Sequence, residues 1–298
     1  MPSPSAVILP NVCWAANAIH SDLLVHSGVL PDCVLPSPPT SVFAFLKSAK
    51  AQPYGRETAQ AQAPELKEAQ LAAAFYGQRT RGDLHDYIRV SPSRVLFALL
   101  DVAGRMEQNR AVLAAVQSTF RACGPQLLVR DDTNEADAMI EISIQLNRAI
   151  LRAAGKVSCT AFVACYNESL GTVCYVNAGH TPGLLRDESG VAELGATGLP
   201  MGLFSHSTPD ASIVAIQPGA ALLLVSRGMV EARRKNTEFG LAQVKNLLSV
   251  TPEQSAQKIC AAVLAGVGEF LSQKPAQNDI TAIALVRSSA GKSFAAAG

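Results

Sequence analysis

The chain has 298 residues, of which 48% are hydrophobic and 16% charged, and its formal net charge is +1 at pH 7. This length is sufficient for one large domain or two small ones with a sizeable buried core. A charge so close to neutral gives no global attraction to nucleic acid or to acidic membrane surfaces, so neither is expected as a partner.

Seven cysteines lie at positions 13, 33, 123, 159, 165, 174 and 260, without any CxxC spacing. Their odd number and the apolar surroundings of several predict buried free thiols in a reducing compartment. No apolar run approaches the roughly 20 residues that a membrane-spanning helix needs. The apolar stretch 6–18 contains Pro10 and Asn11 and follows no basic residue, so a signal peptide is not favoured and a cytoplasmic location is expected.

Residues 1–64 are expected to form an extension or linker without recognisable chemistry. The segment 31–39 is rich in proline, and 52–64 is polar and rich in alanine and glutamine. The folded domain is predicted over 65–289, followed by a disordered tail over 290–298.

The first part of the domain contains strand signals of unequal strength. Residues 65–78 fit either a helix or a strand, because short apolar runs do not separate the two. Tyr87–Val90 is strand-like. Val95–Leu100 is a continuous apolar run that stops at Asp101, which is typical of a strand buried on both faces.

Two amphipathic helices are predicted next. The first covers Glu107–Cys123 and is expected to end at Gly124-Pro125, since both residues disfavour a helix interior. The second covers Thr133–Ala154, and Asp132 and Glu135 have the spacing of a capping box at its start.

Short strands separated by turns dominate the rest of the domain. Strands are predicted over Cys159–Tyr166, Thr172–Val176, Gly183–Leu185, Ser212–Ile216, Ala221–Val225 and Ile280–Val286, and helices over Leu241–Leu248 and Pro252–Leu271. Hairpin-linked strands and helices in separate blocks indicate an α+β fold with antiparallel sheets.

Three aspartates fall at predicted strand ends: Asp83, Asp101 and Asp279. Two carboxylates about 4 Å apart repel by roughly 4 kcal/mol at an effective dielectric constant near 20, so a cluster of them requires a cation. Oxygen-rich clusters suit Mg²⁺ or Mn²⁺, which bind phosphates and lower the pKa of bound water. An aspartate at a strand end is also a common turn or cap residue, and the sequence alone does not bring the three together.

Six motifs, taken in order, resemble those of one protein family. They are G-D-L-H-D at 82–86, D-V-A-G at 101–104, N-A-G-H-T-P at 177–182, G-L-P-M-G at 198–202, S-R-G-M-V-E-A at 226–232 and N-D-I-T at 278–281. Their order and spacing resemble the metal-dependent PPM-type serine/threonine phosphatases, in the SpoIIE/RsbU-like bacterial branch. The resemblance covers about Leu71 to Arg287.

The resemblance implies a four-layer αββα sandwich, with two antiparallel sheets between helix pairs and a metal-binding cleft at one end of the sheets. It also implies hydrolysis of phosphoserine or phosphothreonine by a water molecule that bridges two Mg²⁺ or Mn²⁺ ions. The known substrates of this branch are small phosphorylated anti-anti-sigma (STAS) proteins. A phosphorylated regulatory protein of this type is therefore the expected partner.

The resemblance assigns roles to particular residues. Asp101 matches the carboxylate that bridges the two metals, and Asp83 matches a ligand that binds directly or through water, so these two are the catalytic candidates. The backbone carbonyl of Val102 would bind one metal. Asp279 is assigned to the same group of ligands.

Two positions depart from the family pattern. Arg227 stands where the family has an aspartate, and a guanidinium has only donors and cannot bind Mg²⁺. Asn278 stands where the first aspartate of D-D-I-T is expected, and its single neutral oxygen makes it a weak or lost ligand.

Two arrangements of Arg227 are open from the sequence. If its side chain pairs with Asp101 or Asp83, it takes over the charge neutralisation that a metal provides. If it points to solvent, one metal is still bound by Asp83, Asp101 and Asp279. We expect a phosphatase with impaired metal binding and activity, holding one metal or none; the alternative is a pseudophosphatase that serves as a phosphoprotein-binding module.

The turn Asn177-Ala178-Gly179-His180 belongs to the best-kept motif but contains none of the expected ligands. A structural role is favoured for Asn177, Gly179 and His180, with acid–base catalysis by His180 as the alternative. The basic run Arg233-Arg234-Lys235 is expected to be a solvated loop, with contact to a phosphoprotein as its alternative.

Overall fold

A computed structural model describes residues 63–76, 82–104, 106–154, 157–251, 255–272 and 276–289. The expected tail over 290–298 and all but the last two residues of the expected extension over 1–64 lie outside the described residues. The five cysteines within them are free and buried, as predicted. No helix in this part of the chain is long and apolar enough to cross a membrane.

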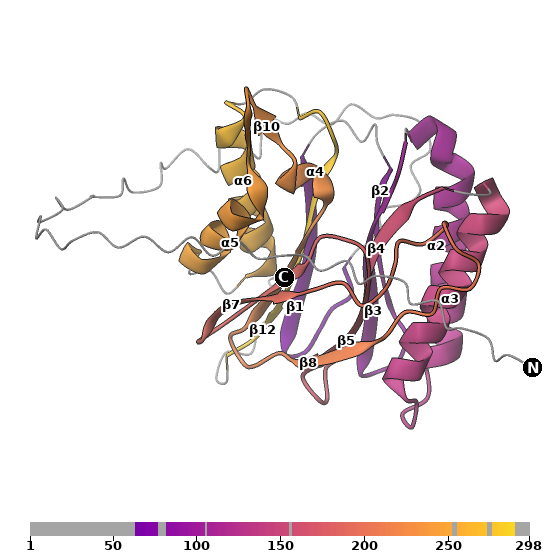
Figure 1. Ribbon diagram of the computed structural model, residues 1–298. Coiled ribbons are helices and arrows are strands. Elements are labelled where there is room, and N and C mark those ends of the chain that lie inside the picture. The colour runs from indigo at the N-terminus through magenta and orange to yellow at the C-terminus, as the bar shows by residue number, and fades with distance from the viewer. Residues whose placement is uncertain are drawn as a thin grey trace, which may run out of the picture. The chain divides into compact units, whose positions relative to one another are not determined.

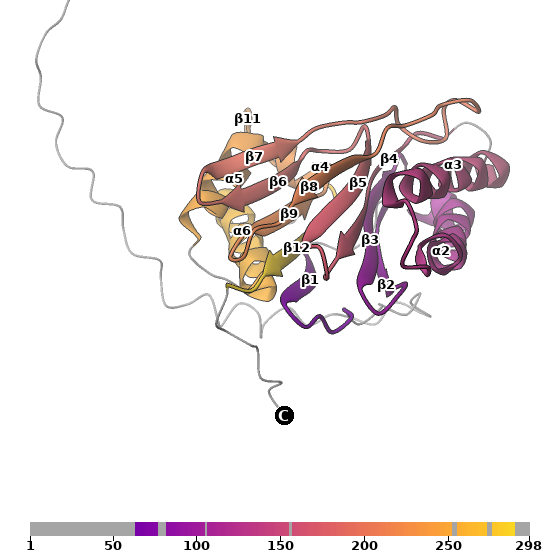
Figure 2. The ribbon, with the colours of Figure 1, turned by 90° about the horizontal axis from the view of Figure 1, so that it is seen from below.

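The described domain has four layers, in which two five-stranded sheets lie between two pairs of helices (Figures 1 and 2). In spatial order, the first sheet contains β1 (Ala69–Tyr76), β12 (Ile280–Arg287), β9 (Ala221–Val225), β6 (Gly183–Asp187) and β7 (Gly190–Leu194). The second contains β2 (Asp83–Arg89), β3 (Arg94–Val102), β4 (Cys159–Asn167), β5 (Thr172–Ala178) and β8 (Ser212–Ala215). The neighbouring strands pair antiparallel throughout both sheets, which confirms the predicted α+β fold.

Helices cover the outer face of each sheet. Figure 2 shows α5 (Gly240–Val250) and α6 (Ala256–Phe270) against the first sheet, and α2 (Met106–Leu128) and α3 (Glu135–Ala154) against the second. Three short elements complete the chain: α4 (Arg227–Val230), β10 (Arg233–Arg234) and β11 (Thr237–Glu238).

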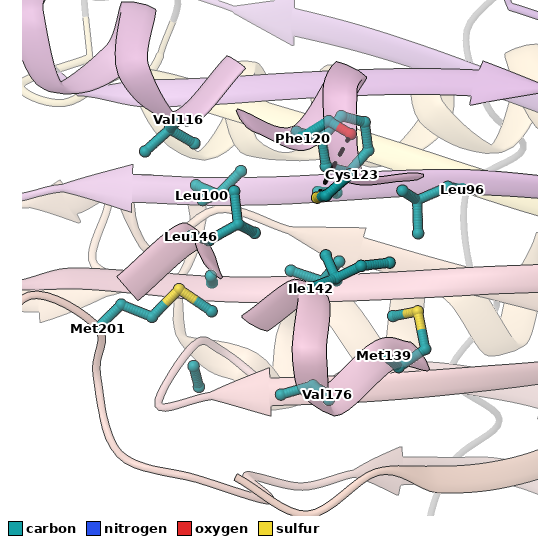
Figure 3. Packing of buried hydrophobic residues seen from close by; sticks show 14 of the residues in the cluster. Leu96, Leu100, Val116, Phe120, Cys123, Met139, Ile142, Leu146, Val176 and Met201 are labelled. Atoms are coloured by element: carbon teal, nitrogen blue, oxygen red, sulfur yellow. Dashed lines mark hydrogen bonds between the residues drawn. The ribbon is translucent and has the colours of Figure 1, made fainter. Parts of the chain in front are cut away.

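Strand β3 shows how the sequence specifies the two inner layers. Its apolar run is buried on both faces, as predicted, because alternate side chains enter different cores. Leu96, Ala98 and Leu100 pack against the helix pair α2–α3, whereas Val95, Phe97 and Leu99 pack against the first sheet. Figure 3 shows Leu96 and Leu100 in one cluster with side chains of these two helices, including Phe120 and Leu146.

Several element boundaries differ from those predicted. The ambiguous segment 65–78 forms strand β1, and β2 begins at Asp83 instead of Tyr87. The predicted helix end at Gly124-Pro125 is wrong, because α2 continues to Leu128. A Cβ atom at Gly124 would lie 2.8 Å from Leu96 Cδ2, so the glycine allows α2 to lie close to the sheet. This packing overrides the low helix propensity of glycine and proline.

The predicted capping box at the start of α3 is also wrong. Asn134 caps the helix instead, since its Oδ1 accepts hydrogen bonds from the backbone N–H groups of Ala136 and Asp137, at 3.1 and 3.4 Å. Asp132 pairs with Arg130 at the surface. Glu135 turns into the protein.

A buried ion pair holds this end of α3 against the second sheet. Arg94 Nε on β3 donates to Glu135 Oε1 at 2.6 Å, and Asn167 Nδ2 on β4 donates to the same oxygen at 2.6 Å. The Arg94 guanidinium also donates to the carbonyl groups of Arg130 and Asp131. The buried charges are therefore both paired and hydrogen-bonded, which is the condition under which they are tolerated.

Replacing Arg94 by leucine should destabilise the domain by about 3–5 kcal/mol, because Glu135 would remain as an unpaired buried charge. Urea unfolding followed by circular dichroism measures the change. The matched control is Arg130→Leu, which removes the exposed pair with Asp132 and should change the stability little. Equal, small effects of the two substitutions would contradict this account of the fold.

Candidate active site

The register of two strands brings Asp83 and Asp101 together. Strands β2 and β3 pair antiparallel with Asp83 directly opposite Asp101. Like charges in directly opposed cross-strand positions are destabilising, so this pairing requires compensation from elsewhere in the fold.

The first sheet supplies the other side of the site. Strands β9 and β12 pair antiparallel, so the end of β9, followed by Arg227, lies next to the start of β12, preceded by Asn278 and Asp279. Both sheets therefore contribute to one cavity of about 50 Å³. It is lined by Asp83, Asp101, Ala103, Gly104, Arg227, Gly228, Asn278 and Asp279.

Arg227 lies against Asp101. Its Nε is 3.3 Å from Asp101 Oδ2 and 3.8 Å from Glu231 Oε1, one turn further along the chain. The Arg227 side chain is 51% exposed, whereas that of Asp101 is only 13% exposed. The guanidinium thus reaches the mouth of the cavity from the first sheet and pairs with a carboxylate of the second.

Asp83 sits in a network of hydroxyl groups. Thr281 Oγ1 donates to Asp83 Oδ2 at 2.9 Å, and Ser226 Oγ accepts a hydrogen bond from the Thr281 backbone N–H at 3.0 Å. Burial and, to a smaller extent, the Asp101 charge raise the pKa of Asp83 to about 7, although hydrogen bonds from Ser226 and Thr281 oppose the shift. Burial also raises the pKa of Asp101, against the opposing effect of Arg227.

Sequence reasoning assigned no role to Ser226 or Thr281. Both fall inside motifs that resemble the family pattern, S-R-G-M-V-E-A and N-D-I-T, which was the available signal. Ser226 Oγ also donates to the backbone carbonyl of Asp279 at 3.3 Å. The two hydroxyl groups therefore tie the strand ends of the first sheet to Asp83.

Two glycines allow the backbones around the cavity to approach closely. A Cβ atom on Gly82 would lie 2.0 Å from the carbonyl oxygen of Val102, and one on Gly228 would lie 2.0 Å from that of Asp279. Any other residue would force these backbones apart. The Val102 carbonyl, which the family resemblance assigns to a metal, lies 3.5 Å from Asn109 Nδ2.

The residues present do not fit a two-metal centre. Within the described parts of the chain, no group of three or more His, Cys, Asp or Glu side chains is arranged to hold a metal ion. The guanidinium beside Asp101 has no acceptor, and the Asn278 side chain offers one neutral oxygen. No catalytic step through bridging metals follows from this arrangement.

The turn at 177–180 is held by its own hydrogen bonds. Asn177 Oδ1 accepts from the backbone N–H of His180 at 2.8 Å, and Asn177 Nδ2 donates to the Leu194 carbonyl at 3.3 Å. Gly179 has a φ of +68°, which favours glycine. Burial lowers the pKa of His180 to about 4, so its ring is neutral at pH 7. Its Nδ1 contacts Thr181. Hydrogen bonds between Asn177 and Thr197 connect the turn to the loop that follows β7.

The sandwich of two antiparallel sheets with an acidic cavity at their ends defines the class of PPM-type phosphatases. The RsbU and RsbW domains of Rv1364c from Mycobacterium tuberculosis superpose with a TM-score of 0.62 at 21% identity, covering 76% of this chain and 63% of that one. RsbX in complex with magnesium superposes with a TM-score of 0.55 at 14% identity, covering 76% and 99%. At such identities the likeness shows the fold.

The sequence pattern of the family Stage II sporulation protein E (SpoIIE) matches residues 91–288, and the chain belongs to this family. Protein IcfG of Synechocystis sp. is 22% identical over 197 residues, which is 59% of this chain and 31% of that protein. Phosphoserine phosphatase RsbP of Bacillus subtilis is 26% identical over 152 residues, 50% of this chain and 36% of that protein. The chain thus spans about a third of the length of these curated relatives.

Replacing Asp83 by asparagine should stabilise the metal-free protein at pH 8 and leave its stability nearly unchanged at pH 4. The carboxyl has a pKa of 3.8 ordinarily and about 7 when folded, so the folded state binds more protons between these values. Stability therefore falls as the pH rises from about 4 to about 7 and stays low above it. Thermal unfolding in EDTA at both pH values measures the effect.

The matched control for this substitution is Asp131→Asn, at an exposed position. It should change the melting temperature equally little at both pH values. A destabilised Asp83→Asn protein at pH 8 would show that the Asp83 carboxylate is satisfied in the cavity without a proton or a metal.

Proposed function

We propose that this domain acts on phosphoserine or phosphothreonine of a regulatory protein, as a SpoIIE-like phosphatase with weakened metal binding and low turnover. The observation that carries the proposal is the contact between Arg227 and Asp101 in the cavity where the family motifs converge. The cavity contains three aspartates of the family pattern, and one of them, Asp101, forms an ion pair with Arg227.

The charges in the cavity support weak rather than abolished attraction for Mg²⁺ or Mn²⁺. Three carboxylates (Asp83, Asp101 and Asp279) face a single guanidinium, Arg227, so negative charge remains when all are ionised. Oxygen ligands of this kind suit the hard cations on which the family depends. Under this proposal the cavity holds one metal or none, with Asp83 and Asp279 as its main protein ligands and Asn278 as a weak one.

The chain's own residues position the carboxylates. Thr281 and Ser226 orient Asp83 through their hydroxyl groups, and Arg227 orients Asp101. A metal bound there would polarise the phosphoryl group and lower the pKa of a bound water. The alternative, a pseudophosphatase that binds a phosphoprotein without hydrolysis, uses the same residues and differs only in lacking that chemistry.

The partner proposed is a phosphorylated regulatory protein, of the STAS anti-anti-sigma type that the family resemblance implies. The similarity to a phosphoserine phosphatase, RsbP, supports the phosphoserine part of this proposal. The five buried free thiols fit a reducing compartment, so a cytoplasmic location belongs to the same proposal.

Changing Arg227 and Asn278 together to aspartate should restore metal binding and hydrolysis. The double variant regains two carboxylate ligands and loses the competing guanidinium, so its affinity for Mn²⁺ should rise by roughly 10–100-fold. Isothermal titration calorimetry with Mn²⁺ and phosphate release from a phosphoserine peptide measure the two effects.

Adding Asp101→Asn to the double variant is the control, and it should remove the gained hydrolysis while the fold remains intact. Stoichiometric binding of two metals and ordinary turnover by the unaltered protein would overturn the proposal of weakened metal binding. A double variant that binds Mn²⁺ but releases no phosphate would favour the pseudophosphatase.

A further inference from the structure

A basic hairpin follows the cavity residues Arg227 and Gly228 closely along the chain. Strands β10 and β11, with the two residues between them, form a hairpin over Arg233–Glu238, and every one of its residues is exposed. It contains three basic residues (Arg233, Arg234 and Lys235) and one acidic residue, Glu238, so its net charge is +2. Figure 1 shows β10 beside α4, the helix that begins with Arg227.

The hairpin is anchored at its base. Ala232 and Phe239, which flank it, are buried in the core beneath α5 and α6, and the Phe239 backbone N–H donates to the Ala232 carbonyl at 2.8 Å. The Arg234 guanidinium lies 5.5 Å from the centroid of the Phe270 ring on α6. A partner that binds here would therefore lose little free energy in ordering the loop.

The charged residues of the hairpin differ in whether they have an ion-pair partner. Arg233 Nε donates to Glu238 Oε1 at 2.8 Å, so this pair is internally neutral. Arg234 stacks on Phe270, and its Nη1 lies 3.5 Å from Ser272 Oγ. Lys235 lies at the tip with a φ of +57°, and among the described residues its ammonium group has no ion-pair partner. Two positive charges are thus presented to solvent at a defined place.

The cavity itself offers a phosphoprotein little long-range attraction. Its lining contains three carboxylates and one guanidinium, so these residues carry no net positive charge to attract an anionic substrate. The hairpin begins three residues after α4, the single turn that contains the cavity residues Arg227 and Gly228, and it carries positive charge. Charge complementarity of this kind steers association and selects partners more than it increases affinity.

We propose that the hairpin Arg233–Glu238 is a docking surface for an acidic segment of the partner protein, adjacent in that protein to its phosphorylated residue. This inference rests on the proposed function for the position of the phosphorylated residue. The binding of acidic side chains to Arg234 and Lys235 stands on the hairpin alone. Carboxylates of the partner would pair with the Lys235 ammonium and the exposed edge of the Arg234 guanidinium.

The test uses three synthetic peptides of equal length and the full chain. The first has a phosphoserine flanked by glutamates, the second has the same glutamates around an unphosphorylated serine, and the third has a phosphoserine flanked by glutamines. Fluorescence anisotropy gives Kd at low and high salt. The first peptide should bind at least threefold more tightly than the third at low salt, and this preference should shrink as salt screens the charges.

Charge reversal at the tip should remove the preference. Lys235→Glu should weaken binding of both glutamate peptides by roughly fivefold, and Lys235→Gln should have an intermediate effect. Lys258→Glu is the matched control, because it reverses an exposed charge about 18 Å further along α6 from Phe270. It should leave all three affinities unchanged, and thermal unfolding should show that all variants are folded.

The outcomes separate the two proposals. Equal binding of the glutamate- and glutamine-flanked phosphopeptides, or no effect of Lys235→Glu, would overturn the docking surface while leaving the proposed phosphoserine recognition intact. Equal binding of the two glutamate peptides, weakened by Lys235→Glu, would support the docking surface and count against phosphoserine recognition in the cavity. A single-stranded oligonucleotide that binds more tightly than the acidic peptides would overturn an acidic protein segment as the occupant.

Discussion

The opposition of Asp83 and Asp101 across strands β2 and β3 is the constraint on which the rest of the site depends. Their register follows from the core of the second sheet, where a shift by one residue would turn every apolar side chain of β3 to the wrong face. The carboxylates therefore cannot move apart without loss of the core. Their charge must instead be balanced in place, and Arg227 does so from the other sheet.

A metal ion in this position would both neutralise the carboxylates and activate a water molecule, whereas an arginine performs only the first of these tasks. A guanidinium stabilises a neighbouring carboxylate. Unlike a metal ion, it does not act as a Lewis acid and does not generate a nucleophilic water. Ser226 and Thr281 form a hydrogen-bond network at Asp83, so this part of the cavity is held in place even with an arginine at position 227. Membership of the SpoIIE family rests on the sequence pattern over residues 91–288, whereas the proposal of weak catalysis rests on the residues at 227 and 278.

Secondary structure and candidate ligands could be predicted from the sequence where several neighbouring residues gave the same indication. The β3 run was identified as a doubly buried strand because six apolar residues follow one another, and the aspartates at strand ends were identified as ligand candidates by type and position. Their convergence depends on the register of β2 with β3 and of β9 with β12, which only the family resemblance supplied. Local rules failed where burial competes with them: Glu135 pairs with Arg94 instead of capping α3, and Gly124 allows close packing instead of ending α2.

The elements α4, β10 and β11 were not predicted from the sequence. Each has only two to four residues, which is too short to show a periodicity. These same elements connect the cavity with its surroundings. The Glu231 backbone N–H donates to the Arg227 carbonyl at the end of α4. The Phe239 backbone N–H donates to the Ala232 carbonyl at the base of the hairpin, so backbone hydrogen bonds close both short elements. Arg227 lines the cavity, whereas Arg234 and Lys235 lie on the hairpin outside it. Under the two proposals, partner docking at the hairpin and hydrolysis in the cavity depend on different residues.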